Sequence, residues 1–359
     1  MNSFGKNLRI TLFGASHEAY IGLVIDGFPA GITIDFDLIK SKLNLRKGLG
    51  SIISSRLEND NFEIISGYFH HFTTGAPLTF LVRNEDVKSE DYEKQYGLAR
   101  PSHGDYVLHM KHQGFNDYYG GGTSSGRLTV ALIILGALCE QLNKQKGIYV
   151  GSIVKSLGEI TDEQGDISLE DIIVLAEEPF PVRNNLKKQK MLEIIDLAKA
   201  KKDSLGATIQ TGVFNLPIGL GSPFFNSVES VISHLIFSVP GVKGIEFGEG
   251  FQIAKKMGSE ANDQMYFEND VVKYETNKSG GVNAGITNGN PLLFQTAFRP
   301  TTSIGILQNT IDFIKKENVK VSHNGRHDVV FAIKALHVVN ALTNYAVLEM
   351  FLEENKWKN

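Results

Sequence analysis

The chain has 359 residues, of which 42% are apolar and 21% charged, and its formal net charge is −4. These values are typical of a globular protein with a sizeable core, and the slightly acidic balance argues against nucleic acid or an anionic membrane as a partner. The only cysteine, Cys139, excludes an intrachain disulfide and a cysteine-rich zinc site. Its apolar neighbours predict a buried, unreactive thiol. No metal site is predicted.

The N-terminal residues 1–14 contain no long apolar core and no small-residue cleavage site, so they do not resemble a signal peptide. The longest apolar run, residues 130–139, is about half of the ~20 residues that a membrane helix needs. We interpret this run as a buried helix. The sequence therefore predicts a soluble, cytoplasmic protein with no membrane partner.

The first part of the chain combines short strand patterns with glycine-rich turns. Residues 37–45 have helical spacing, and Asp37 is expected only to begin that helix. Strands are predicted at residues 8–13, 23–26, 32–34, 62–65 and 78–82.

Strand and helix patterns continue after the apolar run, in an irregular order that does not fit a βαβ repeat and predicts the α+β class. Residues 263–278 and 308–321 are polar, and no element is predicted there. With no repeat or low-complexity linker visible, residues 1–359 are interpreted as one domain. Strands are predicted at residues 148–155, 207–215, 242–247 and 292–298, and helices at 169–177, 187–201, 227–237 and 330–351.

Residues 100–129 carry the strongest functional signal, reading RPSHGDY, a short polar run and GGGTSSGRLT. Three glycines let backbone N–H groups approach a ligand, while Ser124 and Ser125 add hydroxyl donors. Arg127 supplies a planar cation, and His103 exchanges protons near neutral pH. This composition suits a multiply anionic small molecule, but it also describes a flexible surface loop. Neither GxxxxGK[ST] nor a strand–GxGxxG–helix pattern occurs, which disfavours a generic nucleotide-binding module.

Eight motifs follow one another from residue 14 to residue 328: GASHEAYIG, IDGFPAG, RPSHGDY, GGGTSSGR, GVKGIEFGEGF, SGGVNAGITNG, RPTTS and GRHD. In this combination the chain resembles the chorismate synthase family. The resemblance implies a lyase of the shikimate pathway, which supplies aromatic amino acid biosynthesis. Its reaction converts 5-enolpyruvylshikimate 3-phosphate to chorismate and phosphate by trans-1,4 elimination. The resemblance also implies a homotetramer and a β-α-β sandwich, with helices packed between two largely antiparallel sheet layers.

The resemblance further implies reduced FMN (FMNH2) as the cofactor, although the reaction has no net redox change. NADPH is considered as the reductant of this flavin. The sequence leaves open whether the chain reduces its own flavin, and the lack of a visible reductase domain favours an external flavin reductase as a partner. The small-molecule substrate carries a phosphate and two carboxylates, so several cations are expected around it.

Three catalytic residues are implied by the family's motifs. His17 is expected to assist departure of the phosphate, His103 to lie against the reduced flavin and govern its protonation, and Asp328 to help remove the ring hydrogen near flavin N5. Asp328 is also expected near the N-terminus of the C-terminal helix. The other eight histidines and Glu246 are interpreted as ordinary surface or core residues.

Substrate- and flavin-binding positions are implied in the same way, and the arginines among the substrate-binding residues are expected to converge on one pocket. The substrate-binding residues are Ser16, Arg46, Arg100, Ser125 and Arg127. The flavin contacts are Thr123, Ser124, Ser125, Pro240, Gly241, Ala284, Arg299, Pro300, Thr301, Thr302, Ser303 and Arg326.

Several neighbouring positions depart from the family's pattern, although His17, His103 and Asp328 match it. Two hypotheses therefore remain: a working enzyme, or a divergent member that binds flavin or an anionic ligand with weak or no turnover. The family has arginine where this chain has Ile52 and Thr123, and this loss predicts weaker flavin or phosphate binding. Leu128 and Leu132 replace a buried Glu–Arg pair of the family, and the joint loss of such a pair can be neutral for stability. The departures are Ala15, Glu18, Ile52, Thr123, Leu128, Leu132, Ala284, Arg299 (family lysine) and Lys334 (family arginine).

Overall fold

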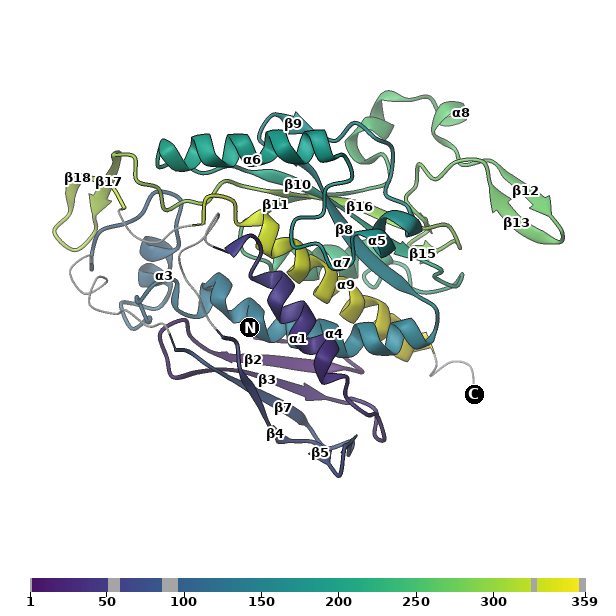
Figure 1. The fold of residues 1–359 in the computed structure, drawn as a ribbon, viewed down its shortest axis with the longest axis horizontal. Coiled ribbons are helices and arrows are strands. Elements are labelled where there is room, and N and C mark those ends of the chain that lie inside the picture. The colour runs from purple at the N-terminus through teal and green to yellow at the C-terminus, as the bar shows by residue number, and fades with distance from the viewer. Residues whose placement is uncertain (1, 51–58, 86–95, 324–327, 355–359) are drawn as a thin grey trace.

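The computed structural model describes residues 2–50, 59–85, 96–323 and 328–354 (Figure 1). Two five-stranded antiparallel sheets form its framework. The first has the strand order β1 (Ser3–Phe4), β2 (Arg9–Gly14), β3 (Tyr20–Asp26), β7 (Leu78–Arg83), β4 (Phe62–Ser66). The second has the order β11 (Val242–Phe247), β16 (Leu292–Phe298), β10 (Ala207–Phe214), β8 (Tyr149–Leu157), β9 (Ile160–Thr161).

Three helices, α1 (Phe36–Arg46), α4 (Thr129–Gln145) and α9 (Ala332–Glu354), are drawn between these sheets in Figure 1. Helices α4 and α9 pass each other closely: a Cβ added to Gly136 would lie 2.2 Å from the Cβ of Ala341, so only glycine fits there. Further helices are α3 (Asp105–Lys111), α5 (Leu169–Val174), α6 (Asn185–Ala200), α7 (Val228–Phe237) and α8 (Gly258–Ala261), with 3-10 turns at Gly122–Ser124, Gly126–Leu128 and Gly250–Lys255.

The strand patterns follow from which faces are covered. In β3 the alternate residues Ile21, Leu23 and Ile25 are fully buried, and they face the helices as the period of two requires. Strand β10 is buried at nearly every position because both α9 and α5 pack against it. One core of apolar side chains joins both sheets and the helices between them.

Helices α4 and α9 are apolar around most of their circumference, which is the pattern of a helix buried on all sides. By length and composition, both the segment Gly126–Gln145, which contains α4, and α9 could cross a membrane, contrary to the prediction that no segment approaches this length. However, 89% of the apolar window in the first and 83% in the second is buried inside the protein. Packing in the core therefore accounts for their composition. Cys139 of α4 is buried as predicted, and burial raises the pKa of its thiol.

One predicted strand is wrong, and two hairpins were not predicted. Residues 32–34 form no strand: Ile32 accepts from the Thr73 N–H and donates to the Thr73 Oγ1, and the Thr33 carbonyl accepts from the side chain of Gln141. The polar residues 263–278 contain the hairpin β12 (Met265–Glu268) and β13 (Val271–Tyr274). Residues 308–321 form the hairpin β17 (Gln308–Asp312) and β18 (Glu317–Val321). The hairpin β12–β13 is largely exposed, and in β17 the less exposed positions Gln308, Thr310 and Asp312 are polar, so neither β12–β13 nor β17 shows an apolar alternation.

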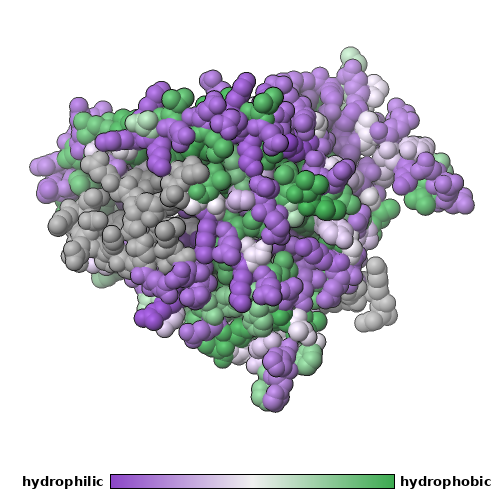
Figure 2. All heavy atoms as spheres, in the orientation of Figure 1, coloured by the Kyte–Doolittle hydropathy of each residue, from purple (hydrophilic) through white to green (hydrophobic). Residues whose placement is uncertain are grey.

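Two small hairpins complete the strands: β5 (Tyr68–Phe69) with β6 (Phe72–Thr73), and β14 (Val282–Asn283) with β15 (Ile286–Thr287). Figure 2 shows mainly hydrophilic residues on the face seen in Figure 1, with smaller hydrophobic groups between them.

The mixed helix and strand content with several antiparallel sheets confirms the predicted α+β class. The assignment of residues 1–359 to one domain stays a prediction.

His337 of α9 predicts a pH-dependent loss of stability. Burial lowers the pKa of this imidazole to about 4, and the positive charges of Lys42 and Arg46 act in the same direction. The hydrogen bond to the Pro179 carbonyl opposes this shift. The unfolded chain therefore binds the proton first, so stability is full above pH ~6.5 and falls as the pH drops towards 4. We expect a loss of about 3 kcal/mol from this residue. Urea unfolding at several pH values should show a flatter profile for His337→Gln but not for His112→Gln, an exposed control. Equal slopes for parent and His337→Gln would contradict this assignment.

Candidate active site

A cavity of about 690 Å³ lies where several loops meet, a size typical of small-molecule sites. Its wall comes from the loop after β2, the end of α1, the glycine-rich segment before α4, the end of α7 and the start of α9. Most of the predicted site residues border it: Ser16, His17, Arg46, Arg100, His103, Ser124, Ser125, Arg127, Pro240, Gly241, Arg299, Pro300, Thr301, Thr302, Ser303 and Asp328.

The wall of this cavity is strongly basic although the whole chain is slightly acidic. Seven lysine and arginine side chains border it against two aspartates, Asp60 and Asp328. Such a local excess of cations favours a multiply anionic ligand. The three arginines that were predicted to converge are all present. The cations are Arg46, Lys47, Arg100, Arg127, Lys243, Arg299 and Lys334.

Ser16 and His17 form one corner of the cavity. The Oγ of Ser16 lies 2.9 Å from Nδ1 of His17 and donates to the Tyr119 carbonyl at 3.2 Å. Gly120 packs so closely that a Cβ there would lie 2.6 Å from Cε1 of His17, and its φ of +66° also favours glycine. The glycine-rich loop therefore lets its backbone pass directly beside the histidine.

Arg46 and Arg127 share one buried carboxylate at a second corner. The side chain of Asp60 is only 1% exposed, and it pairs through Oδ1 with Arg127 and through Oδ2 with Arg46, the latter at 3.4 Å. The Nε of Arg127 also donates to Oδ1 of Asn84 at 3.0 Å. Asn84 in turn donates from Nδ2 to the carbonyl of Ala15 at 3.1 Å. This network ties the two arginines to the loop that carries Ser16 and His17.

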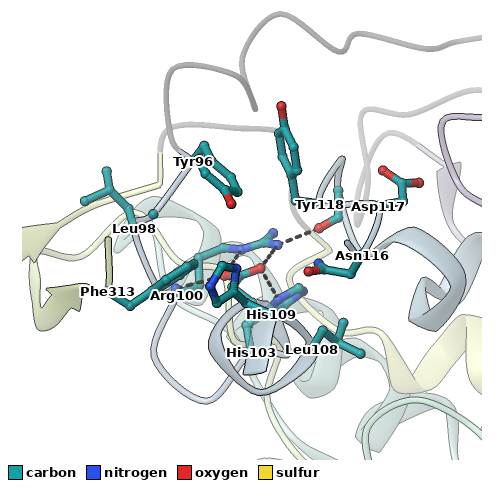
Figure 3. Close-up of a pocket in the computed structure, with 14 residues that line it drawn as sticks. Tyr96, Leu98, Arg100, His103, Leu108, His109, Asn116, Asp117, Tyr118 and Phe313 are labelled. Carbon is teal, nitrogen blue, oxygen red and sulfur yellow. Dashed lines mark hydrogen bonds and ion pairs between the residues drawn. The ribbon is translucent and has the colours of Figure 1, made fainter. Parts of the chain in front are cut away.

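Arg100 and His103 meet at a third corner, on the wall of a smaller pocket (Figure 3). Both bind the carboxylate of Asp105, the first residue of α3. Nε and Nη2 of Arg100 donate to it at 2.9 and 2.6 Å, and Nδ1 of His103 lies 2.8 Å from Oδ1. Burial opposes ionisation of this carboxyl, but the hydrogen bonds from Arg100 and His103 outweigh burial and hold its pKa well below the usual range.

Asp328 lies shortly before α9 rather than in its first turn. Its Oδ1 accepts a hydrogen bond from Nζ of Lys334 at 2.8 Å, and the carboxylate is about one-fifth exposed. Lys334 thus places a cation where the family has an arginine.

The segment 299–303 and the turn Pro240–Gly241 form a further part of the cavity wall. The backbone N–H of Arg299 donates to the Gly241 carbonyl at 2.9 Å, and its guanidinium donates to the Ser102 carbonyl at 3.3 Å. The Oγ1 of Thr301 is buried and has no hydrogen-bond partner among the residues that the structure describes. A buried hydroxyl without a partner at a cavity wall is suited to a ligand that supplies one.

Three predicted flavin contacts are not placed at this cavity. Thr123 lies in the 3-10 turn beside it but does not border it. Ala284 lies in the turn between β14 and β15, next to Gly285, which packs against Ser227. Arg326 lies outside the described residues, as does Ile52.

Sequence reasoning missed Asp60, Asn84 and Asp105. The Asp105 signal was present in RPSHGDY, two residues after the histidine, whereas Asp60 and Asn84 reach the site only through tertiary packing. Among the departures, Leu128 and Leu132 are buried in the apolar core. Apolar packing thus occupies these two positions, where the family has a glutamate and an arginine.

The comparisons with known proteins agree with one another. The sequence profile of the chorismate synthase family matches residues 8–352. Chorismate synthase of Thermococcus gammatolerans is 38% identical over 99% of this chain and 98% of its own length, and that of Chitinophaga pinensis is 40% identical over the same shares. A crystal structure of chorismate synthase superposes with a TM-score of 0.75 at 25% identity, covering 98% of this chain and 93% of the other. The chain belongs to the chorismate synthase family, and it is therefore a lyase of the shikimate pathway.

Proposed function

We propose that the 690 Å³ cavity is the site at which 5-enolpyruvylshikimate 3-phosphate loses phosphate and a ring hydrogen to give chorismate. The observation that carries this proposal is the convergence of His17, His103 and Asp328 on one cation-lined cavity. Two imidazoles and a carboxylate supply the proton donors and acceptors that an elimination needs. The surrounding cations match the charge of the substrate.

The phosphate and the carboxylates of the substrate bind to different parts of the wall. Arg46 and Arg127 share Asp60 beside the loop of Ser16 and His17, so they hold an anionic group within reach of His17. His17 then donates a proton to the departing phosphate. Arg100 and the hydroxyl of Ser125 orient a further anionic group of the substrate. Desolvation in the cavity strengthens each of these charge interactions.

The residues of the segment 299–303 and of the turn Pro240–Gly241 fit a flavin. The partnerless Oγ1 of Thr301, the cation of Arg299 and the backbone turn at Gly241 offer polar contacts to reduced FMN, together with Ser124, Ser125 and Ser303. When bound, the reduced flavin supplies the electron-rich partner that the elimination requires without net redox change. His103 holds a proton on the same side of the cavity, and Asp328 accepts the proton that leaves the substrate ring.

The finer points of architecture and cellular context are part of this proposal. We assign the two sheets and the helices drawn between them to the β-α-β sandwich, and we assign the chain to a cytoplasmic homotetramer. Flavin reduction is assigned to an external reductase, with NADPH as the electron source. Ala284 and Thr123, which do not border the cavity in the single chain, and Arg326 stay predicted flavin contacts.

Asp328→Asn separates proton transfer from a structural role. The amide still accepts a hydrogen bond from Lys334 but cannot take up a proton. We expect turnover to fall by about 10²-fold, the low end of the usual contribution of a general base. The melting temperature and the affinities for FMN and substrate should stay near the parental values. Full turnover in this variant would reduce Asp328 to a structural partner of Lys334.

The proposal is tested by mixing the protein anaerobically with reduced FMN and 5-enolpyruvylshikimate 3-phosphate and measuring chorismate. Catalytic chorismate formation supports a working enzyme. Flavin binding without product would instead support the divergent member with weak or no turnover that the departures at Thr123 and Ile52 left open.

A further inference from the structure

Asp105 is the hub of a hydrogen-bond network that the sequence motifs did not single out. One carboxylate oxygen, Oδ2, accepts from the backbone N–H and the Nε of Arg100, both at 2.9 Å. The other, Oδ1, accepts from Nη2 of Arg100 at 2.6 Å and lies 2.8 Å from Nδ1 of His103. Asp105 does not border the large cavity, whereas His103 and Arg100 do, so it lies behind both of them.

The charge of Asp105 determines which ring nitrogen of His103 carries the proton. Three of the four contacts to the carboxylate come from arginine N–H groups, which can only donate. An ionised carboxylate is acceptor-only, so its contact with His103 requires a proton on Nδ1. The neutral imidazole then has its lone pair on Nε2, and Nε2 is the nitrogen that can exchange a proton with a ligand in the cavity.

The same network reaches the other histidine of the site. Nη2 of Arg100 also donates to the Gly120 carbonyl at 2.6 Å. Gly120 packs against the ring of His17, and the preceding Tyr119 carbonyl accepts from Ser16. Arg100 therefore connects Asp105 to the backbone that supports the Ser16–His17 corner.

We propose that Asp105 is a positioning residue that holds His103 as the Nδ1–H tautomer, with Nε2 presented to the cavity, and that fixes Arg100 against the glycine-rich loop. This inference rests on the proposed function of the cavity. The contrasting explanation is that Asp105 only stabilises the start of α3, where a carboxylate is favourable. The tautomer of His103 distinguishes the two, because a purely structural carboxylate has no effect on it.

Asp105→Asn is the decisive variant because the arginine contacts constrain its amide. The Oδ2 position faces two groups that can only donate, the backbone N–H and the Nε of Arg100. The Oδ1 position faces one such group, Nη2 of Arg100, and Nδ1 of His103, which donates or accepts according to the tautomer. The single amide oxygen should therefore occupy the Oδ2 position and keep two hydrogen bonds from Arg100. The NH2 group then faces Nδ1 of His103 and Nη2 of Arg100, so the hydrogen bond from Nη2 is lost at this position. That arrangement forces the proton onto Nε2. In serine proteases the equivalent exchange leaves the geometry intact but lowers kcat about 10⁴-fold through the wrong tautomer.

The test combines nitrogen NMR of the histidine-labelled protein at pH 9 with turnover measurements, and His103→Gln identifies the resonances. We expect the Nδ1–H pattern in the parent and the Nε2–H pattern in Asp105→Asn. We also expect kcat to fall about 10²-fold, with KM and FMN affinity changed less than about threefold. Asp117→Asn is the matched control: it lines the same small pocket and accepts from the Tyr119 N–H, and it should change neither readout.

Two results would overturn the inference: an Nε2–H pattern for His103 in the parent, or unchanged kcat in a folded Asp105→Asn variant. If the variant does not fold, the parental spectrum decides alone. A parent that makes no chorismate would defeat the proposed function, but the tautomer would still be measured independently of turnover.

Discussion

Arg127→Ala is expected to lower the free energy of unfolding by about 3–5 kcal/mol, the range for breaking a buried ion pair by removing one partner. The side chain of Arg127 is 4% exposed and that of Asp60 is 1% exposed, so the variant leaves a carboxylate buried with one of its guanidinium partners removed. It also removes the N–H donor to Asn84, which supports the loop of Ser16 and His17.

The measurement is urea unfolding of parent and variant. Lys243→Ala is the matched control, because this residue also contributes a cation to the cavity but has an exposed side chain, and its loss should change stability by at most about 0.5 kcal/mol. A loss below 1 kcal/mol for Arg127→Ala would show that the Asp60 pair does not hold this part of the site together.

His17→Ala is expected to lower turnover by about 10²–10⁴-fold, the usual contribution of a general acid. His17 borders the same cavity as the cations Arg46 and Arg127, and its Nδ1 is held by Ser16, which orients the ring. Removing the imidazole leaves the phosphate to depart without a proton donor. The fold should be retained, because the ring lies at the cavity wall and not in the apolar core.

This prediction is checked by steady-state turnover with reduced FMN at saturation, alongside melting temperature and FMN affinity. His112→Gln, an exposed histidine, serves as the control that should keep full activity. If His17→Ala turns over at the parental rate, another group protonates the phosphate, and the assignment of His17 fails.

The regular elements with a covered face could be predicted from the sequence. Strands β11 and β16 have the predicted bounds, and α9 differs from its prediction by a few residues at each end. Their apolar patterns reflect burial against the other layers. The hairpin β12–β13 was missed because nearly all of its residues are exposed, and β17–β18 because the less exposed positions of β17 are polar, so no apolar alternation marks β12–β13 or β17.

The site could be predicted only in part. The motifs identified His17, His103, Asp328 and the arginines, because a family resemblance fixes residue types at known positions. The partners that hold them are set by three-dimensional packing: Asp60 meets Arg127 across 67 positions of sequence, and Asn84 meets it across 43. Neither contact leaves a local pattern. Asp105 differs from these two residues, because it lies in the same motif as its partner, two residues after His103.

The most direct test of the central claim is the stoichiometry of the reaction under anaerobic conditions. Chorismate, inorganic phosphate and flavin oxidation state are measured together after mixing the parental protein with a small amount of reduced FMN and an excess of 5-enolpyruvylshikimate 3-phosphate. The account predicts equal amounts of chorismate and phosphate, many turnovers per flavin and no net flavin oxidation. Phosphate release without chorismate, or oxidation of one flavin per product, would contradict it.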